Sequence, residues 1–123
     1  MVNALTQAAK DNSIPVHVGI SVSSDTFWPG QERYDSFTGY VTKAFQGTLK
    51  EWQSLGALNY EMETSALFVT AQTLGIKAGA VCGVVAKRTD SEEIAPSNVY
   101  DTAFAGQVKI TVGALKQLLK AGE

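Results

Sequence analysis

"VHVGISVSSDTFWPGQERYD", residues 16–35, joins a β-branched run to a loop crowded with polar and aromatic side chains. The first half, residues 16–24, predicts a largely buried strand, because parallel strands covered on both faces carry near-continuous apolar runs. The second half follows the carboxyl end of that strand, where open α/β sheets bind their ligands. The stretch therefore predicts an α/β fold with a binding loop at the edge of its sheet.

The flanking sequence alternates between helical and strand patterns. Helical spacing and start or stop signals predict helices at residues 2–10, 48–55, 64–75 and 99–120. A short strand is possible at 57–63, a second buried strand is expected at 76–87, and a polar loop follows it. The apolar side of the last helix is expected from Ala103, Val108, Ile110, Val112, Leu115 and Leu119. Because average sheets have more strands, the chain is expected to be half of something larger.

Composition narrows the function classes. The chain has 123 residues, enough for one domain, and a net charge of −2, so no basic surface indicates nucleic acid. No signal peptide or membrane-length apolar run stands out, and we expect a cytoplasmic protein without a membrane partner. Without a GxGxxG, a P-loop or metal-spaced His and Cys residues, neither a nucleotide cofactor nor a metal is predicted.

Two single residues receive structural interpretations. Cys82 stands in the apolar run "AVCGVV" and is expected to be a small buried side chain in a reducing compartment. The alternative is a reactive thiol, which would need a basic or helix-start context. His17 lies inside the first strand pattern and is interpreted as a core or edge histidine rather than a catalyst.

The loop after the first strand offers groups that can hold a flat polar ring. Phe27 provides a stacking face, Gln31 provides an amide, and Arg33 provides a planar fork of donors. Pro29 and Gly30 favour a turn that aims these groups together. An amide and a guanidinium complement the carbonyl and N–H edge of a pyrimidine base. The alternative is a solvated loop in which Arg33 pairs with a neighbouring acid.

Two further stretches carry candidate groups. In "NYEMET", residues 59–64, Glu61 and Glu63 would point the same way from a strand end and could grip the hydroxyls of a ribose. Met62 between them could pack on the sugar or fill the core. The alternative for both acids is capping of the following helix. In "VVAKRT", residues 84–89, Arg88 could stabilise a leaving group or simply be exposed.

Together these three stretches resemble the nucleoside phosphorylase family, and within it the uridine phosphorylases. "SSDTFWPGQERYD", "NYEMET" and "GVVAKRT" occur in the family's order and at its separations. The resemblance implies that Phe27 packs against the pyrimidine and ribose while Gln31 and Arg33 read the uracil edge. It also implies that Val84 and Val85 line the base pocket.

The remaining site residues follow from the same resemblance. It implies that Glu61, Met62 and Glu63 line the ribose site, and that Glu63 holds the sugar hydroxyls as one of two catalytic residues. The other is Arg88, which supports the base carbonyl through water. Purine-specific relatives place an acid near the start of the loop after the last strand. Here the first acid in that loop is Asp90, which favours a pyrimidine base.

The resemblance also implies a fold and a reaction. The fold is the three-layer α/β/α nucleoside phosphorylase domain with the N-terminal half of its sheet missing, so that residues 1–123 form its C-terminal half. The reaction is reversible phosphorolysis of uridine to uracil and ribose 1-phosphate, with phosphate as co-substrate and no cofactor.

The family is hexameric, so a homo-oligomer is expected. Because the family's phosphate site lies in the missing half, the isolated chain is expected to be inactive. One alternative is a noncatalytic nucleoside-binding piece or an inactive fragment. Another is a nucleosidase, which uses water in place of phosphate and which the "PGQER" loop disfavours.

Overall fold

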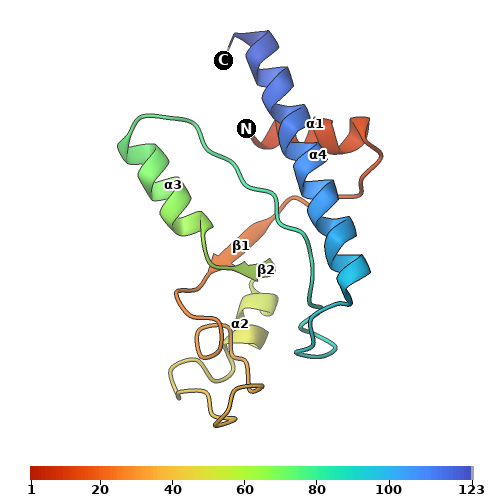
Figure 1. Cartoon of the computed structure of the whole chain (residues 1–123). Helices are drawn as coiled ribbons and strands as arrows, with labels where there is room; N and C mark the ends of the chain where they lie inside the picture. The colour runs from red at the N-terminus through yellow and green to blue at the C-terminus, as the bar shows by residue number, and fades with distance from the viewer. Residues whose placement is uncertain (123) are drawn as a thin grey trace.

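The computed structural model describes residues 1–122 as a mixed α/β arrangement with a small parallel sheet (Figure 1). Its elements are, in chain order, α1 (Val2–Asp11), β1 (Ile20–Ser23), α2 (Thr48–Ser54), β2 (Ala57–Glu61), α3 (Thr64–Thr73) and α4 (Ser97–Ala121). The predicted helices are therefore confirmed to within a few residues of their ends, and residues 57–61 are a strand. No helix within residues 1–122 is long and apolar enough to cross a membrane.

Helices α1 and α4 pack on each other and form the main apolar core (Figure 1). Ala8 and Ala9 of α1 are fully buried against Ile110 and Ala114 of α4. Small side chains let the two helix backbones approach closely. At Gly113 of α4 a Cβ atom would lie 3.0 Å from the Cβ of Ala8.

Strands β1 and β2 run parallel, as expected for strands joined by a helical crossover. Ser23 is opposite Glu61 at the carboxyl ends of the two strands, so the segments that follow both strands begin side by side. Helix α2 lies in the connection between the strands and ends at Ser54; Gly56 follows two residues later, and its φ of +82° suits glycine just after a helix. This pairing places the loop after β1 next to the start of α3.

The strand predicted for residues 16–24 is shorter and more exposed than expected. Only Ile20–Ser23 pair with a neighbour, Val18 keeps 64% of its surface exposed, and His17 is exposed rather than part of a core. Burial on both faces requires covering layers, and Val18 and Ile20 remain 64% and 63% exposed. The expectation of a largely buried strand is therefore wrong for this chain, and of the two interpretations of His17, core or edge, its exposure excludes the core.

The strand predicted for residues 76–87 does not form. These residues are extended but pair with no strand within residues 1–122, and Val84 keeps 69% of its surface exposed. Cys82 in the same segment is exposed, so its interpretation as a buried thiol is also wrong. A ladder needs a neighbouring strand, and the described part of the chain provides two strands that pair only with each other.

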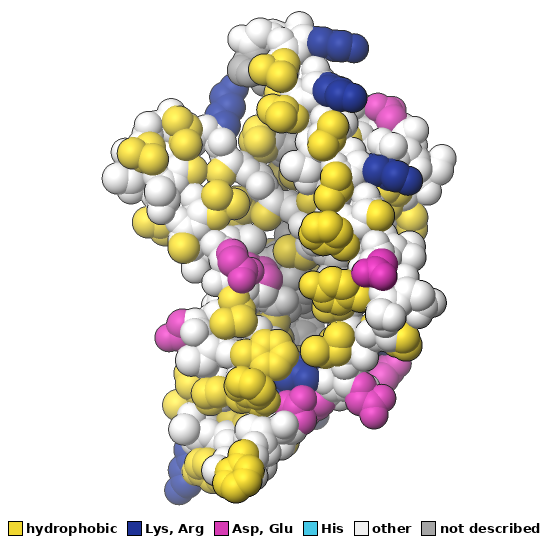
Figure 2. All heavy atoms as spheres, viewed as in Figure 1, with side chains coloured by type: hydrophobic (Ala, Val, Ile, Leu, Met, Phe, Trp, Pro, Cys, Tyr) yellow, Lys and Arg dark blue, Asp and Glu magenta, His cyan; other side chains and the backbone are white. Residues whose placement is uncertain are grey.

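Helix α4 exposes a stripe of apolar side chains, which Figure 2 displays along the length of the helix. The stripe consists of Val99, Tyr100, Phe104, Val108, Val112, Leu115 and Leu119. Most of the residues predicted for the buried side of this helix lie in the stripe; Ile110 is the one that is fully buried, and the buried face is completed by Ala114 and Gly113. The architecture is thus α/β but partial, with apolar faces left uncovered.

Candidate functional site

The loop that follows β1 is a compact turn held by internal hydrogen bonds rather than an open, solvated loop. Gly30 N donates to Thr26 Oγ1 at 2.9 Å, and Arg33 N donates to Trp28 O at 2.8 Å. Glycine is required at residue 30 because a Cβ atom there would lie 2.9 Å from Thr26 O. The turn buries the side chains of Gln31 and Arg33, which the sequence predicted as the base-reading pair.

Arg33 is almost fully buried, at 2% exposure, and its guanidinium is held from several directions. Nε and Nη2 donate to the Asp35 carboxylate at 3.2 and 2.7 Å, and Nη2 also donates to Glu92 O. This pairing lowers the pKa of Asp35 below its usual range. No acceptor within residues 1–122 takes a hydrogen bond from Nη1. Arg33 therefore forms the ion pair considered as the alternative and still keeps one amino group for a ligand.

Phe27 is fixed by the same guanidinium. The Arg33 Cζ atom lies 4.5 Å from the centroid of the Phe27 ring, in a cation–π contact. Trp28 meets the ring edge at 5.2 Å between centroids and 85° between planes. Since one face of the ring is covered by Arg33, stacking on a ligand is left to the opposite face.

Arg88 braces this loop from a segment more than 50 residues further along the chain. Nη1 donates to Gln31 O and Nη2 donates to Glu32 O, both at 3.0 Å, while Nε is buried without a partner among the described residues. Burial and then the nearby positive charge of Arg33 lower the pKa of Arg88. The structure thus brings Phe27, Gln31, Arg33 and Arg88 together.

The three residues predicted for the ribose site diverge. The Glu61 carboxylate accepts hydrogen bonds from Ser23 Oγ and from Thr64 N at 2.6 Å. Burial disfavours its charge, but these bonds prevail and lower its pKa. Glu61 therefore ties β1 to the start of α3, as in the capping alternative. Met62 and Glu63 are exposed, and among residues 1–122 the Glu63 carboxylate accepts only from Met62 N, at 3.2 Å.

Val84 and Val85 lie on the unpaired segment before Arg88. Val85 is half-buried, and its carbonyl accepts a hydrogen bond from Ala95 N at 2.7 Å, which closes the base of the 88–95 loop. Val84 is mostly exposed. Their predicted contact with a base remains a prediction.

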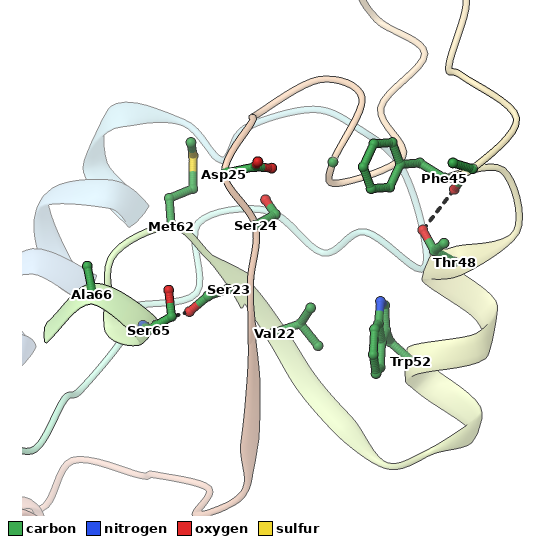
Figure 3. Close-up of a pocket in the computed structure, with 12 residues that line it drawn as sticks. Val22, Ser23, Ser24, Asp25, Phe45, Thr48, Trp52, Met62, Ser65 and Ala66 are labelled. Carbon is green, nitrogen blue, oxygen red and sulfur yellow. Dashed lines mark hydrogen bonds between the residues drawn. The ribbon is translucent and has the colours of Figure 1, made fainter. Parts of the chain in front are cut away.

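A cavity of about 600 Å³ lies beside the loop, between β1, α2 and α3 (Figure 3). Figure 3 shows Val22 and Trp52 on facing walls and Met62 above the start of α3. Met62 is the one predicted site residue that lines it, whereas Arg33 and Phe27 do not. The cavity is therefore adjacent to the base-reading side chains and does not contain them.

Sequence reasoning missed a residue that the structure places at the centre of this site. Tyr34 N and Asp35 N donate to the Glu92 carboxylate at 2.8–2.9 Å. Glu92 stands in the polar stretch 88–98, where nothing in the pattern distinguishes it from Glu93. The pairing of the two loops could not be found from spacing along the chain.

Neither the cysteine thiol nor a cluster of metal-binding side chains provides a further candidate site among residues 1–122. Partial burial and then the charge of Glu61 raise the pKa of Cys82, so its thiol lacks the lowered pKa of a nucleophile. Within residues 1–122, no three His, Cys, Asp or Glu side chains gather as metal ligands do.

Comparison with known proteins gives consistent matches over most of the chain. A family model described as the phosphorylase superfamily matches residues 1–121. Over 116 residues, the chain is 54% identical to a uridine phosphorylase from Haemophilus influenzae and 44% identical to one from Escherichia coli. A uridine phosphorylase from Klebsiella aerogenes is 44% identical over the same length. These alignments cover 94% of this chain and 46% of each relative, so the chain spans about half the length of the curated relatives that it matches.

Proposed function

Because the chain belongs to the phosphorylase superfamily, we propose that it carries the base-binding and ribose-binding half of a uridine phosphorylase. The reaction is reversible: phosphate displaces uracil from C1′ of the ribose, so that the C1′–N1 bond breaks and a C1′–O bond forms. The observation that carries the proposal is the buried Arg33 guanidinium, packed over Phe27 with no acceptor for its Nη1 group among the described residues.

Arg33 suits the chemistry of a departing uracil. Negative charge develops on the carbonyl oxygens of the base as the glycosidic bond breaks, and a preorganised cation stabilises that charge most effectively when water is excluded. Asp35 and Glu92 hold the guanidinium in one orientation, so no reorganisation is needed during the reaction. Gln31, two residues before Arg33 and also buried, supplies a side-chain amide for the adjacent edge of the uracil ring.

Arg88 holds the backbone of the loop that carries Gln31 and Arg33. Its two amino groups are occupied by loop carbonyls, and its Nε is the buried donor still available. In this role it reaches the base carbonyl through a water molecule rather than directly.

The loop chemistry also supports a pyrimidine over a purine. Protonation of a purine requires an acid that is neutral near pH 7. Lys87 donates a hydrogen bond to Asp90 and lowers its pKa, which keeps that carboxylate ionised. Asp90 is accordingly a poor proton donor, and a uracil leaving group, stabilised by arginine, does not need one.

The ribose and the phosphate would lie outside the loop. We propose that Glu63 accepts hydrogen bonds from the sugar hydroxyls and that Met62 packs against the ring, with Glu61 fixing the turn that presents both. Of the two arginines of the chain, Arg33 belongs to the base-binding loop and Arg88 donates its two amino groups to carbonyls of that loop. Phosphate, as co-substrate without a metal or organic cofactor, would be bound by the other half of the catalytic unit. A homo-oligomer is proposed separately, from the resemblance to the family.

Uracil binding is the direct test. Trp28 touches Phe27, so its fluorescence reports on the loop, and Trp52→Phe removes the second tryptophan. We expect saturable quenching by uracil that Arg33→Ala weakens by about a hundredfold, because a charged hydrogen bond contributes on the order of 3 kcal/mol. Lys109→Ala removes an exposed cation on α4 and should leave the affinity unchanged. Equal affinities for both variants would refute the assignment.

A second candidate function is noncatalytic nucleoside binding, and it is favoured by the placement of the two arginines of the chain. With both guanidiniums committed to the loop, the chain by itself has no arginine for phosphate. Uracil release from uridine should then be absent without the other half of the unit, whether or not phosphate is added. Phosphate-dependent release that Arg33→Ala abolishes would instead establish catalysis by this chain. Release that is independent of phosphate would establish a nucleosidase.

A further inference from the structure

The loop at residues 88–95 and the turn at 26–35 are joined in both directions. Arg88, at the start of the later loop, donates two hydrogen bonds to carbonyls of the turn at 3.0 Å. Arg33, at the end of the turn, donates to the Glu92 carbonyl of the later loop. Each segment therefore depends on the other for its conformation, although more than 50 residues separate them.

Glu92 closes this connection with its side chain. One carboxylate oxygen accepts from Tyr34 N at 2.9 Å, and the other accepts from both Tyr34 N and Asp35 N at 2.9 and 2.8 Å. A carboxylate that accepts backbone N–H groups forms charge-assisted bonds, which are stronger than neutral ones. These bonds fix the backbone of Asp35, whose side chain in turn fixes Arg33.

Glu92 thus acts on Arg33 by two routes. Its carbonyl accepts directly from Nη2, and its carboxylate fixes the residue that pairs with Nε and Nη2. Glu93, the next residue, has the same charge but is exposed, and no hydrogen bond of its carboxylate is found within residues 1–122. Position, and not charge alone, distinguishes the two acids.

We propose that Glu92 is a positioning residue that latches the 88–95 loop onto the base-binding turn and orients Arg33 toward the base. This rests on the proposed function, in which Arg33 binds uracil. It has a consequence for the loop: a base that engages Arg33 also stabilises the contact between the 88–95 loop and the turn, because the same guanidinium takes part in both.

The latch itself can be tested without a ligand. In Glu92→Ala we expect hydrogen exchange at the Tyr34 and Asp35 amides to quicken by about tenfold or more, since both lose their acceptor. The Nε–H signal of Arg33, one of two arginines, should shift at the same time. Glu92→Gln keeps one carbonyl oxygen and should give an intermediate rate, and Glu93→Ala should match the unmutated chain. Helical circular dichroism confirms that each variant is folded.

The positioning role is tested by uracil titration of the same variants. Glu92→Ala should weaken uracil binding by about tenfold, Glu92→Gln by less, and Glu93→Ala not at all. In an Arg33→Lys background, which cannot form the planar pair with Asp35, Glu92→Ala should add little further loss.

The outcomes separate the latch from the proposed function. Equal uracil affinities for Glu92→Ala and Glu93→Ala, or additive losses with Arg33→Lys, would overturn the positioning role. Unchanged exchange at Tyr34 and Asp35 in Glu92→Ala would overturn the latch, whatever happens to uracil. A lack of uracil binding by the unmutated chain would overturn the proposed function and with it the positioning role.

Discussion

Two glycines of helix α4 provide a matched test of the packing between the ends of the chain. Both Gly106 and Gly113 lie in the helix interior, where alanine is favoured over glycine by about 1 kcal/mol. A Cβ atom at Gly106 would meet Ile14 at 3.8 Å, an ordinary contact, whereas at Gly113 it would meet the Cβ of Ala8 at 3.0 Å. Ala8 is fully buried on α1 and cannot move aside without moving the helix.

These distances give opposite signs for the same substitution. Gly106→Ala should stabilise the fold by about 1 kcal/mol, the difference in helix propensity. Gly113→Ala gains the same amount but incurs an overpacking cost of about 2 kcal/mol, which leaves a net destabilisation of about 1 kcal/mol. The two variants should therefore differ by about 2 kcal/mol in the free energy of unfolding.

Urea denaturation followed by far-ultraviolet circular dichroism measures this difference, with equal m-values required for the comparison. The midpoint should rise for Gly106→Ala and fall for Gly113→Ala. Stabilisation of similar size in both variants would mean that α1 and α4 do not approach as closely as described, and the reasoning from close packing would fail.

Three further outcomes follow from burial and charge. Ile110→Ala should reduce the free energy of unfolding by about 2–5 kcal/mol, because Ile110 is only 2% exposed. The control Ile76→Ala should change it by less than about 0.5 kcal/mol, because Ile76 is 60% exposed. Similar losses for both variants in urea denaturation would contradict the core assignment. The pKa of Glu61 is lower in the folded chain than its ordinary value of 4.5, so its contribution to stability is complete above that value and is lost as the pH falls through the folded pKa. Acid titrations should therefore display a smaller loss of stability below pH 4.5 in Glu61→Gln, and identical curves would refute this. Cys82 should react with iodoacetamide at neutral pH more slowly than free cysteine despite its exposure, because its pKa is raised, and a faster reaction would disprove the raised pKa.

The helices were predictable from sequence because their signals are local. Apolar spacing and a terminal glycine, such as Gly56 after α2, act within a few residues and survive in a partial fold. The parallel pair of β1 and β2 was also within reach, since a helix joins two short β-branched or apolar runs. These elements do not depend on what covers their outer faces.

The strand expected at residues 76–87 was wrong for a nonlocal reason. Its apolar composition predicts a central strand, but a strand forms only where a neighbour accepts its hydrogen bonds, and none does so within residues 1–122. The same missing cover leaves Val84 exposed and shifts the buried face of α4 from its valines and leucines to Ile110 and its small residues.

The candidate site was partly predictable. Arg33 was expected to bind a base or to pair with an acid, and the structure pairs it with Asp35 while leaving Nη1 available. Glu61 was expected to grip a sugar or to cap a helix, and its contacts are those of a cap. Glu92 escaped prediction because its partners lie 57 and 58 residues earlier, a separation that no pattern within one loop encodes.

The packing of α1 on α4 has a consequence for synthesis of the chain on the ribosome. Residues 12–96 separate the two helices, so Ala8 and Ala9 lack Ile110 and Ala114 until α4 emerges from the exit tunnel. At translation speeds of about 5–20 residues per second, α1 waits on the order of ten seconds for α4, its main packing partner. A slower codon tract before α4 would lengthen that interval and give chaperones more time to engage the nascent helix.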